Sequence, residues 1–101
     1  MRIKQTNTYQ KWMDGLRDRQ AQFRIGARIL RLAEGNPGNH KLLPGGITEM
    51  KINYGPGYRV YYIQKGSEII LLLAGGDKRT QGKDIEIAQR LANEWIGNRH
   101  G

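Results

Sequence analysis

Hydrophobic residues in the first third of the chain recur at the three- and four-residue spacing of helices. This spacing defines two helical faces. The faces consist of Tyr9, Trp12, Met13 and Leu16, and of Ala21, Ile25, Ile29 and Leu32. Thr6 or Thr8 can cap the first helix and Asp18 the second, because a side-chain oxygen there accepts an otherwise unpaired amide hydrogen. Residues 35–38, Gly-Asn-Pro-Gly, end the second helix, so the two helices are expected to form a hairpin.

After Gly46 the hydrophobic period changes to two, which is typical of strands. Polar and apolar residues alternate over residues 49–54, and a second strand (YRVYYIQ) follows the turn at residues 55–57. Residues 68–76 (EIILLLAGG) are continuously apolar at their centre, which indicates a strand inside the sheet. Residues 1–5 are expected to form a short strand. Thr80 can cap a last helix, whose buried stripe would be Ile85, Ala88, Ala92 and Trp95.

These elements predict an α+β fold in the order β-α-α-β-β-β-α. Three consecutive strands with short turns favour an antiparallel meander, and we expect the helices to cover one of its faces, giving a small sandwich. With 101 residues, the chain is expected to form a single domain over residues 1–101. Residues 96–101 are expected to form a frayed tail.

The composition limits the functions open to this domain. The chain has 17 Lys and Arg against 9 Asp and Glu, a formal net charge of +8, which favours a polyanionic partner such as nucleic acid. The absence of cysteine excludes disulfides and thiolate metal sites. The apolar run at residues 69–73 is far too short to span a membrane, and the N-terminal MRIKQ lacks the apolar core of a signal peptide. We therefore expect a cytoplasmic protein with no membrane partner.

Several motifs that would bind phosphates or metals are absent. Residues 75–78 (GGDK) lack the spacing of a Walker loop. Residues 55–57 (GPG) are better explained by a hairpin turn than by a dinucleotide-binding loop, since no helix follows them. His40 and His100 lack metal-ligand spacing. We expect neither a metal nor a cofactor.

Basic residues are instead expected to converge on one surface of the sheet. Lys51 lies on the polar face of its strand, and Arg59 lies on the next strand at a comparable distance from the turn. Lys78 and Arg79 follow the central strand, near the start of the last helix, where free amide hydrogens favour anions. Each could be an ordinary solvated charge. Together, with Tyr61 for base stacking, they predict a site for a phosphate backbone.

Three other residues complete the candidate site. Lys65, at the turn after the same strand, is a further candidate for RNA binding. Asp77 and Asp84 could orient the cations or take a proton. The simpler interpretation is that both carboxylates cap or favour the start of the helix.

Three stretches of the chain carry a family resemblance, and they are WMDGLRDRQAQFRIGARILRLAEGNPG, ITEMKINYGPGYRVYY and LLLAGGDKRTQGKDIEIAQRLANEW. They resemble the RelE/ParE superfamily of toxins from bacterial toxin–antitoxin modules. The closest resemblance is to the HigB-like branch often labelled "addiction module killer protein". It covers about residues 3–95, and GPGYRVYY and GGDK are its most specific parts.

The resemblance implies a RelE-like fold and a type II toxin that acts as a ribosome-dependent endoribonuclease, or mRNA interferase. In such enzymes the RNA 2′-hydroxyl attacks the neighbouring phosphate, while cations stabilise the charged transition state. Arg59, Lys51 and either Lys78 or Arg79 match basic positions of the superfamily. The Tyr or His that several relatives place near the C-terminus has no clear counterpart. Asp84 or Tyr61 would substitute for it, or catalysis would rely on electrostatics.

The resemblance also implies partners. These are a helix-turn-helix antitoxin encoded adjacently, the ribosome with its mRNA, and promoter DNA bound through the antitoxin complex. Two alternatives stay open: a ParE-like inhibitor of DNA gyrase with the same fold, and a basic nucleic-acid-binding module that cuts nothing. The cluster of Lys51, Arg59 and Lys78 favours the nuclease, since a gyrase inhibitor needs no convergent phosphate ligands.

Overall fold

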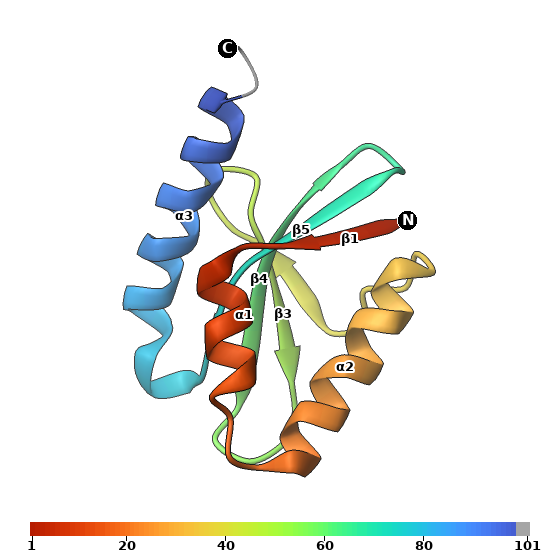
Figure 1. The fold of residues 1–101 in the computed structure, drawn as a ribbon, viewed down its shortest axis with the longest axis vertical. Coiled ribbons are helices and arrows are strands. Elements are labelled where there is room, and N and C mark those ends of the chain that lie inside the picture. The colour runs from red at the N-terminus through yellow and green to blue at the C-terminus, as the bar shows by residue number, and fades with distance from the viewer. Residues whose placement is uncertain (99–101) are drawn as a thin grey trace.

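The computed structural model describes residues 1–98 and has the α+β class that the sequence predicts (Figure 1). Five strands and three helices make up the fold. In chain order they are β1 (Arg2–Gln5), α1 (Asn7–Asp14), α2 (Arg19–Ala33), β2 (His40–Leu42), β3 (Thr48–Ile52), β4 (Tyr58–Lys65), β5 (Ile69–Gly76), the short 3₁₀ helix η1 (Lys78–Thr80) and α3 (Gln81–Asn98).

The strands form one sheet in the order β1-β5-β4-β3-β2. Strands β3, β4 and β5 are antiparallel neighbours, as predicted, and β1 pairs with β5 in parallel. Strand β2, which pairs with β3, was not predicted. Its three residues (HKL) are all exposed, so they show no alternation of polar and apolar positions that could mark a strand.

The helices cover both faces of the sheet, so the prediction that they cover only one face is wrong (Figure 1). One core contains residues of α1 and α2 packed on Met50, Val60 and Tyr62. The other contains Ala88 and Ala92 of α3, packed on the opposite face of β4 and β5. The alternation in β4 is as predicted, but the face that carries Arg59 and Tyr61 is half covered by α3 rather than open.

Side-chain caps define where the helices begin. Thr6 accepts a hydrogen bond from the Tyr9 amide, and Asp18 accepts from the amides of Gln20 and Ala21, as the sequence predicts. Before the last helix, Asp77 caps the 3₁₀ helix η1, and Thr80 completes a reciprocal capping box with it. Helix α3 continues to Asn98, so residues 96–98 belong to the helix and not to a tail, and residues 99–101 lie outside the described part.

Two glycines at the end of β5 allow the helices to approach both faces of the sheet. A Cβ at Gly75 would lie 2.2 Å from Cε3 of Trp12 in α1. A Cβ at Gly76, on the other face, would lie within 3 Å of Thr80 Oγ1 and closer still to the Asp84 carboxylate. The glycines therefore make room for α1 and for the start of α3 where the central strand ends.

Among residues 1–98, no helix is long and apolar enough to cross a membrane.

Candidate functional site

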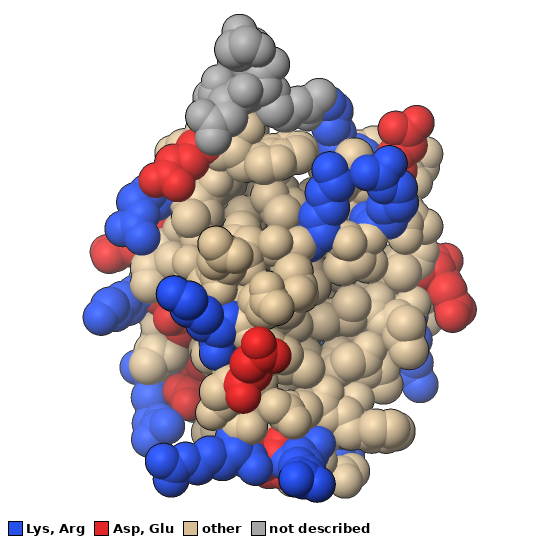
Figure 2. Space-filling view, viewed as in Figure 1, with Lys and Arg blue, Asp and Glu red and all other residues tan. Residues whose placement is uncertain are grey.

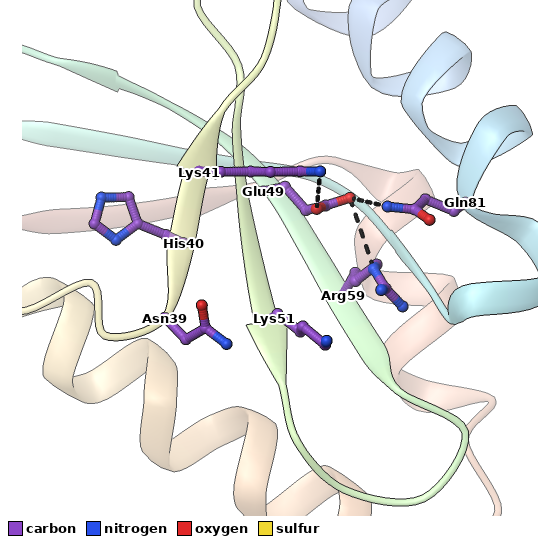
Figure 3. Close-up of a pocket in the computed structure, with 7 residues that line it drawn as sticks. All are labelled: Asn39, His40, Lys41, Glu49, Lys51, Arg59 and Gln81. Atoms are coloured by element: carbon purple, nitrogen blue, oxygen red, sulfur yellow. Dashed lines mark hydrogen bonds and ion pairs between the residues drawn. The ribbon is translucent and has the colours of Figure 1, made fainter.

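A cavity of about 240 Å³ opens on the α3 side of the sheet, where β2, β3 and β4 meet the first residue of α3 (Figure 3). All of its lining residues have polar or charged side chains. The lining residues are Asn39, His40, Lys41, Glu49, Lys51, Arg59 and Gln81. We call this cavity the basic pocket, because it contains three cationic side chains and one carboxylate.

Lys51 and Arg59 lie directly opposite each other on β3 and β4, so their predicted proximity is confirmed. Lys51 is exposed, whereas Arg59 is only 6% exposed. Arg59 Nη1 donates to the Gly57 carbonyl oxygen at 2.7 Å. Its Nε is buried and has no hydrogen-bond partner within the described residues. A guanidinium that the fold holds in place can bind phosphate oxygens through paired hydrogen bonds.

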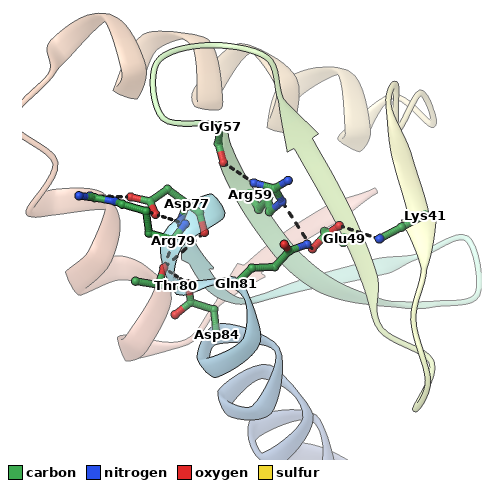
Figure 4. Close-up of polar contacts among 9 residues, drawn as sticks. All are labelled: Lys41, Glu49, Gly57, Arg59, Asp77, Arg79, Thr80, Gln81 and Asp84. Atoms are coloured by element: carbon green, nitrogen blue, oxygen red, sulfur yellow. Dashed lines mark hydrogen bonds and ion pairs between the residues drawn. The ribbon is translucent and has the colours of Figure 1, made fainter.

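Glu49 is the buried anion of the basic pocket, and only 4% of it is exposed. Its Oε2 lies 3.7 Å from Arg59 Nε, and its Oε1 lies 3.8 Å from Lys41 Nζ. Gln81 Nε2 donates to Oε2 at 2.8 Å, which ties the first residue of α3 to the sheet (Figure 4). Burying a carboxylate is costly unless it is paired, so these three partners offset the cost of burying Glu49.

Glu49 was missing from the predicted site, although the sequence contained a signal for it. It stands two residues before Lys51, so the two-residue period places both side chains on the same face of β3. Gln81 carried no comparable signal, because its contact with Glu49 depends on how α3 packs against the sheet.

Lys78 and Arg79 lie beside the basic pocket but do not line it. The position of a Cβ on Gly57 would be 3.3 Å from Arg59 Nη1 and 3.8 Å from Lys78 Cβ, so Lys78 starts next to the arginine. The Arg79 guanidinium is engaged with Asp77 at 3.1 Å. This contact holds the pKa of the Asp77 carboxyl below its usual value. Of the two, Lys78 is therefore the one placed to extend the site.

Asp84 is also outside the basic pocket. It accepts a hydrogen bond from Thr80 Oγ1 in the first turn of α3, and burial raises the pKa of its carboxyl (Figure 4). This geometry fits the simpler interpretation, in which Asp84 organises the start of the helix.

Of the two other predicted RNA contacts, Tyr61 is wrong, whereas Lys65 is exposed but lies away from the basic pocket. Tyr61 is fully buried under α3, so its ring cannot stack on a base. Burial, followed by the neighbouring charge of Glu49, raises the pKa of its phenol. Lys65 ends β4, six residues beyond Arg59, which places it about 20 Å away at the usual rise of a strand. The sequence could not show that Tyr61 is buried, because the helix that covers it lies far away along the chain.

Within the described residues, His40 is the histidine closest to the basic pocket, and it is not directed at Arg59. His40 lies at its rim on β2, and Figure 3 shows its ring pointing away from Arg59. Its Nδ1 lies 2.8 Å from the Gly38 carbonyl oxygen. His100 lies outside the described residues.

One relative shares nearly the whole chain. A Haemophilus influenzae (strain ATCC 51907 / DSM 11121 / KW20 / Rd) protein, described as "Uncharacterized protein", is 45% identical over 94 residues, which cover 93% of this chain and 95% of the relative. This chain belongs to the same family. No protein-family model matches the sequence.

Proposed function

We propose that the chain is a toxin of the RelE/ParE superfamily that cleaves RNA at the basic pocket. The observation that carries the proposal is the buried ion pair of Glu49 and Arg59. It lies at the floor of a pocket with a net positive charge. A purely structural ion pair would not need the open cavity or the exposed Lys51 beside it. Perturbed or buried charges in a cleft are typical of functional sites.

In the proposed reaction, Glu49 takes the proton from a ribose 2′-hydroxyl. The 2′-oxygen then bonds to the neighbouring phosphorus, and the bond from phosphorus to the 5′-oxygen of the next nucleotide breaks. The products are a 2′,3′-cyclic phosphate and a 5′-hydroxyl end. The departing oxygen takes up a proton, and the proposed donors are the ammonium groups of Lys41 and Lys51, which line the pocket.

The cations stabilise the negative charge that develops on the phosphate in the transition state. Arg59 is held by the Gly57 carbonyl, so it is oriented before the substrate arrives. Preorganised donors of this kind stabilise a transition state without the cost of reorganisation. Lys51 and Lys78, both exposed on either side of Arg59, would hold the flanking phosphates.

The same proposal includes the setting in which the protein acts. We infer a cytoplasmic toxin that acts on ribosome-bound mRNA and is neutralised by an adjacently encoded helix-turn-helix antitoxin, whose complex binds promoter DNA. The net charge of +8 supports a polyanionic target. On the viewed face the basic residues lie mainly toward the rim: Figure 2 shows them at the upper right, along the left side and along the lower edge.

Primer extension on cellular transcripts after a brief induction of the protein tests this function. We expect growth arrest, restored by co-expression of the adjacent gene, and discrete cleavages within translated regions. Intact messages together with blocked DNA replication would instead support gyrase inhibition. Unimpaired growth despite confirmed soluble protein would remove the toxin proposal.

A further inference from the structure

Helix α2 carries apolar residues on its outward face as well as on its buried face. Phe23 is 72% exposed and Leu30 is 68% exposed, and Ala27 lies between them on the same line of the helix. Positions i, i+4 and i+7 of a helix share one face. The core of the same helix is formed by Ala21, Ile25 and Leu32 on the opposite side. The outward stripe is therefore not needed for folding.

A groove of about 320 Å³ runs beside this stripe, between α2 and the end of β3. Phe23 and Ala27 form one wall, and Ile52 and Asn53 of the β3 end form the other. Strand β2 pairs only with residues 48–50, so it does not cover this end of β3. The groove lies on the α2 side of the sheet, and none of its residues lines the basic pocket.

Three arginines, Arg24, Arg28 and Arg31, line the groove, and no acidic residue does. Two of them are held in place. Arg28 donates to the carbonyl oxygens of Lys51 at 2.7 Å and of Pro37 at 3.0 Å. Arg24 lies over the Tyr54 ring, 4.7 Å from its centre. The cations are thus ordered along one side of an apolar stripe.

We propose that this face of α2 docks an amphipathic helix of another protein, one with an apolar stripe flanked by Asp and Glu. The stripe from Phe23 to Leu30 spans two turns, roughly 10 Å, which matches the apolar repeat of such a helix. The arginines meet its acidic flank, so charge complementarity selects the partner and its orientation. This inference does not depend on the proposed nuclease activity.

Other occupants fit this face less well. In a symmetric dimer of this chain the same patch meets itself, which would bring the arginines of two highly basic molecules together. A nucleic acid would pair with the arginines but would provide no apolar surface to cover the aliphatic Leu30 and Ala27.

Fluorescence anisotropy with synthetic 20-residue peptides tests the inference directly. The probe is a helix with leucines at i, i+4, i+7 and i+11 and glutamates along one flank. Its controls are the same peptide with lysines for glutamates, and a scrambled peptide that keeps the composition but has no stripe. We expect saturable, salt-sensitive binding of the acidic probe alone, with NMR shifts on α2 and the end of β3.

Matched variants distinguish binding in the groove from nonspecific hydrophobic or electrostatic binding of the probe. Phe23→Ala with Leu30→Ala should weaken the probe about tenfold or more, while Leu42→Ala, at a leucine that is 78% exposed on β2, should leave it unchanged. Arg31→Gln should weaken binding more than Arg90→Gln, which removes the same charge from α3.

No saturable binding of the acidic probe would overturn the proposal, as would equal binding of the lysine or scrambled peptide. A concentration-dependent dimer in sedimentation that disappears with Phe23→Ala and Leu30→Ala would assign the face to a second copy instead. Loss of binding to an RNA oligonucleotide or to anionic vesicles in the same double variant would assign it to those ligands. Activity of the basic pocket should be unaffected in each variant, so a failure here leaves the nuclease proposal standing.

Discussion

At Gly75 the sheet and α1 approach so closely that no side chain fits. A Cβ there would overlap the Trp12 indole, which belongs to the aromatic contact with Tyr9 and Tyr58. We therefore predict that Gly75→Ala lowers the free energy of unfolding by about 1–3 kcal/mol, the typical cost of overpacking a core. Gly82→Ala is the control. Its Cβ would meet nothing within 4 Å, so in helix α3 it should be neutral or slightly stabilising.

Urea unfolding of the two variants and the wild type measures both effects. Equal midpoints for Gly75→Ala and Gly82→Ala would show that Trp12 moves aside without cost.

At Glu49 the side chain has a proposed chemical role that can be separated from its structural one. Glu49→Gln keeps the shape of the side chain and an oxygen that can accept from Gln81, but it cannot take a proton. We predict that the rate of single-turnover cleavage falls by about 10²-fold or more, which is the loss expected when a general base is removed. The variant also leaves Arg59 without its counter-charge, so it should melt at a lower temperature.

Cleavage must then be compared well below the melting temperature of Glu49→Gln. Wild-type cleavage by the folded variant would restrict Glu49 to positioning Arg59 and would call for another base.

At the scale of elements, the sequence predicted what depends on local pattern. The period of two in β3 and β4 placed Lys51 and Arg59 on one face, and Thr6 and Asp18 were found as caps. The cover of α3 over that face was missed, although the apolar run in β5 already indicated burial on both faces. Which helix covers which face depends on contacts between distant residues, and a local pattern does not contain them.

The cap of α2 also connects this helix to the turn after β3, and its contribution to stability should depend on pH. Asp18 caps α2 and accepts a hydrogen bond from the Tyr54 hydroxyl at 2.8 Å, which is the largest cause of the lowered pKa of its carboxyl. A lowered pKa means that the charged form stabilises the fold above the ordinary value of 3.8 and that this stability is lost as pH falls below it.

Asp18→Asn keeps a good capping residue, so it isolates the charge. We predict a lower Tm than wild type at pH 6 and a difference that shrinks toward zero as the pH falls below the ordinary carboxyl value. A difference of the same size in strong acid would contradict the prediction, since Asp18 is then neutral in both states. Circular dichroism melts across this range provide the measurement.

At the scale of the whole molecule, the excess of positive charge should govern association with RNA. Each phosphate that the protein neutralises releases counterions, so affinity should fall steeply with salt. We predict that binding to isolated ribosomes weakens between low and physiological salt, and that Lys51→Ala reduces the slope more than Lys65→Ala, which is distant from the pocket. Sedimentation with ribosomes measures both slopes. A flat response to salt would contradict an electrostatic interface.

Arg59 is the residue on which the β3–β4 pairing, the Gly57 turn and Glu49 converge, and it is central to the proposed cleavage. Single-turnover cleavage of ribosome-bound message by Arg59→Ala is therefore its most direct test, with Lys65→Ala as the control on the same strand and thermal melting as the control for folding. We predict that Arg59→Ala slows cleavage by about 10²–10³-fold, as for the loss of one preorganised donor. Arg59→Lys should recover only part of the rate, because an ammonium keeps the charge but loses the two-pronged contact. Cleavage at the wild-type rate by a well-folded Arg59→Ala variant would contradict the account.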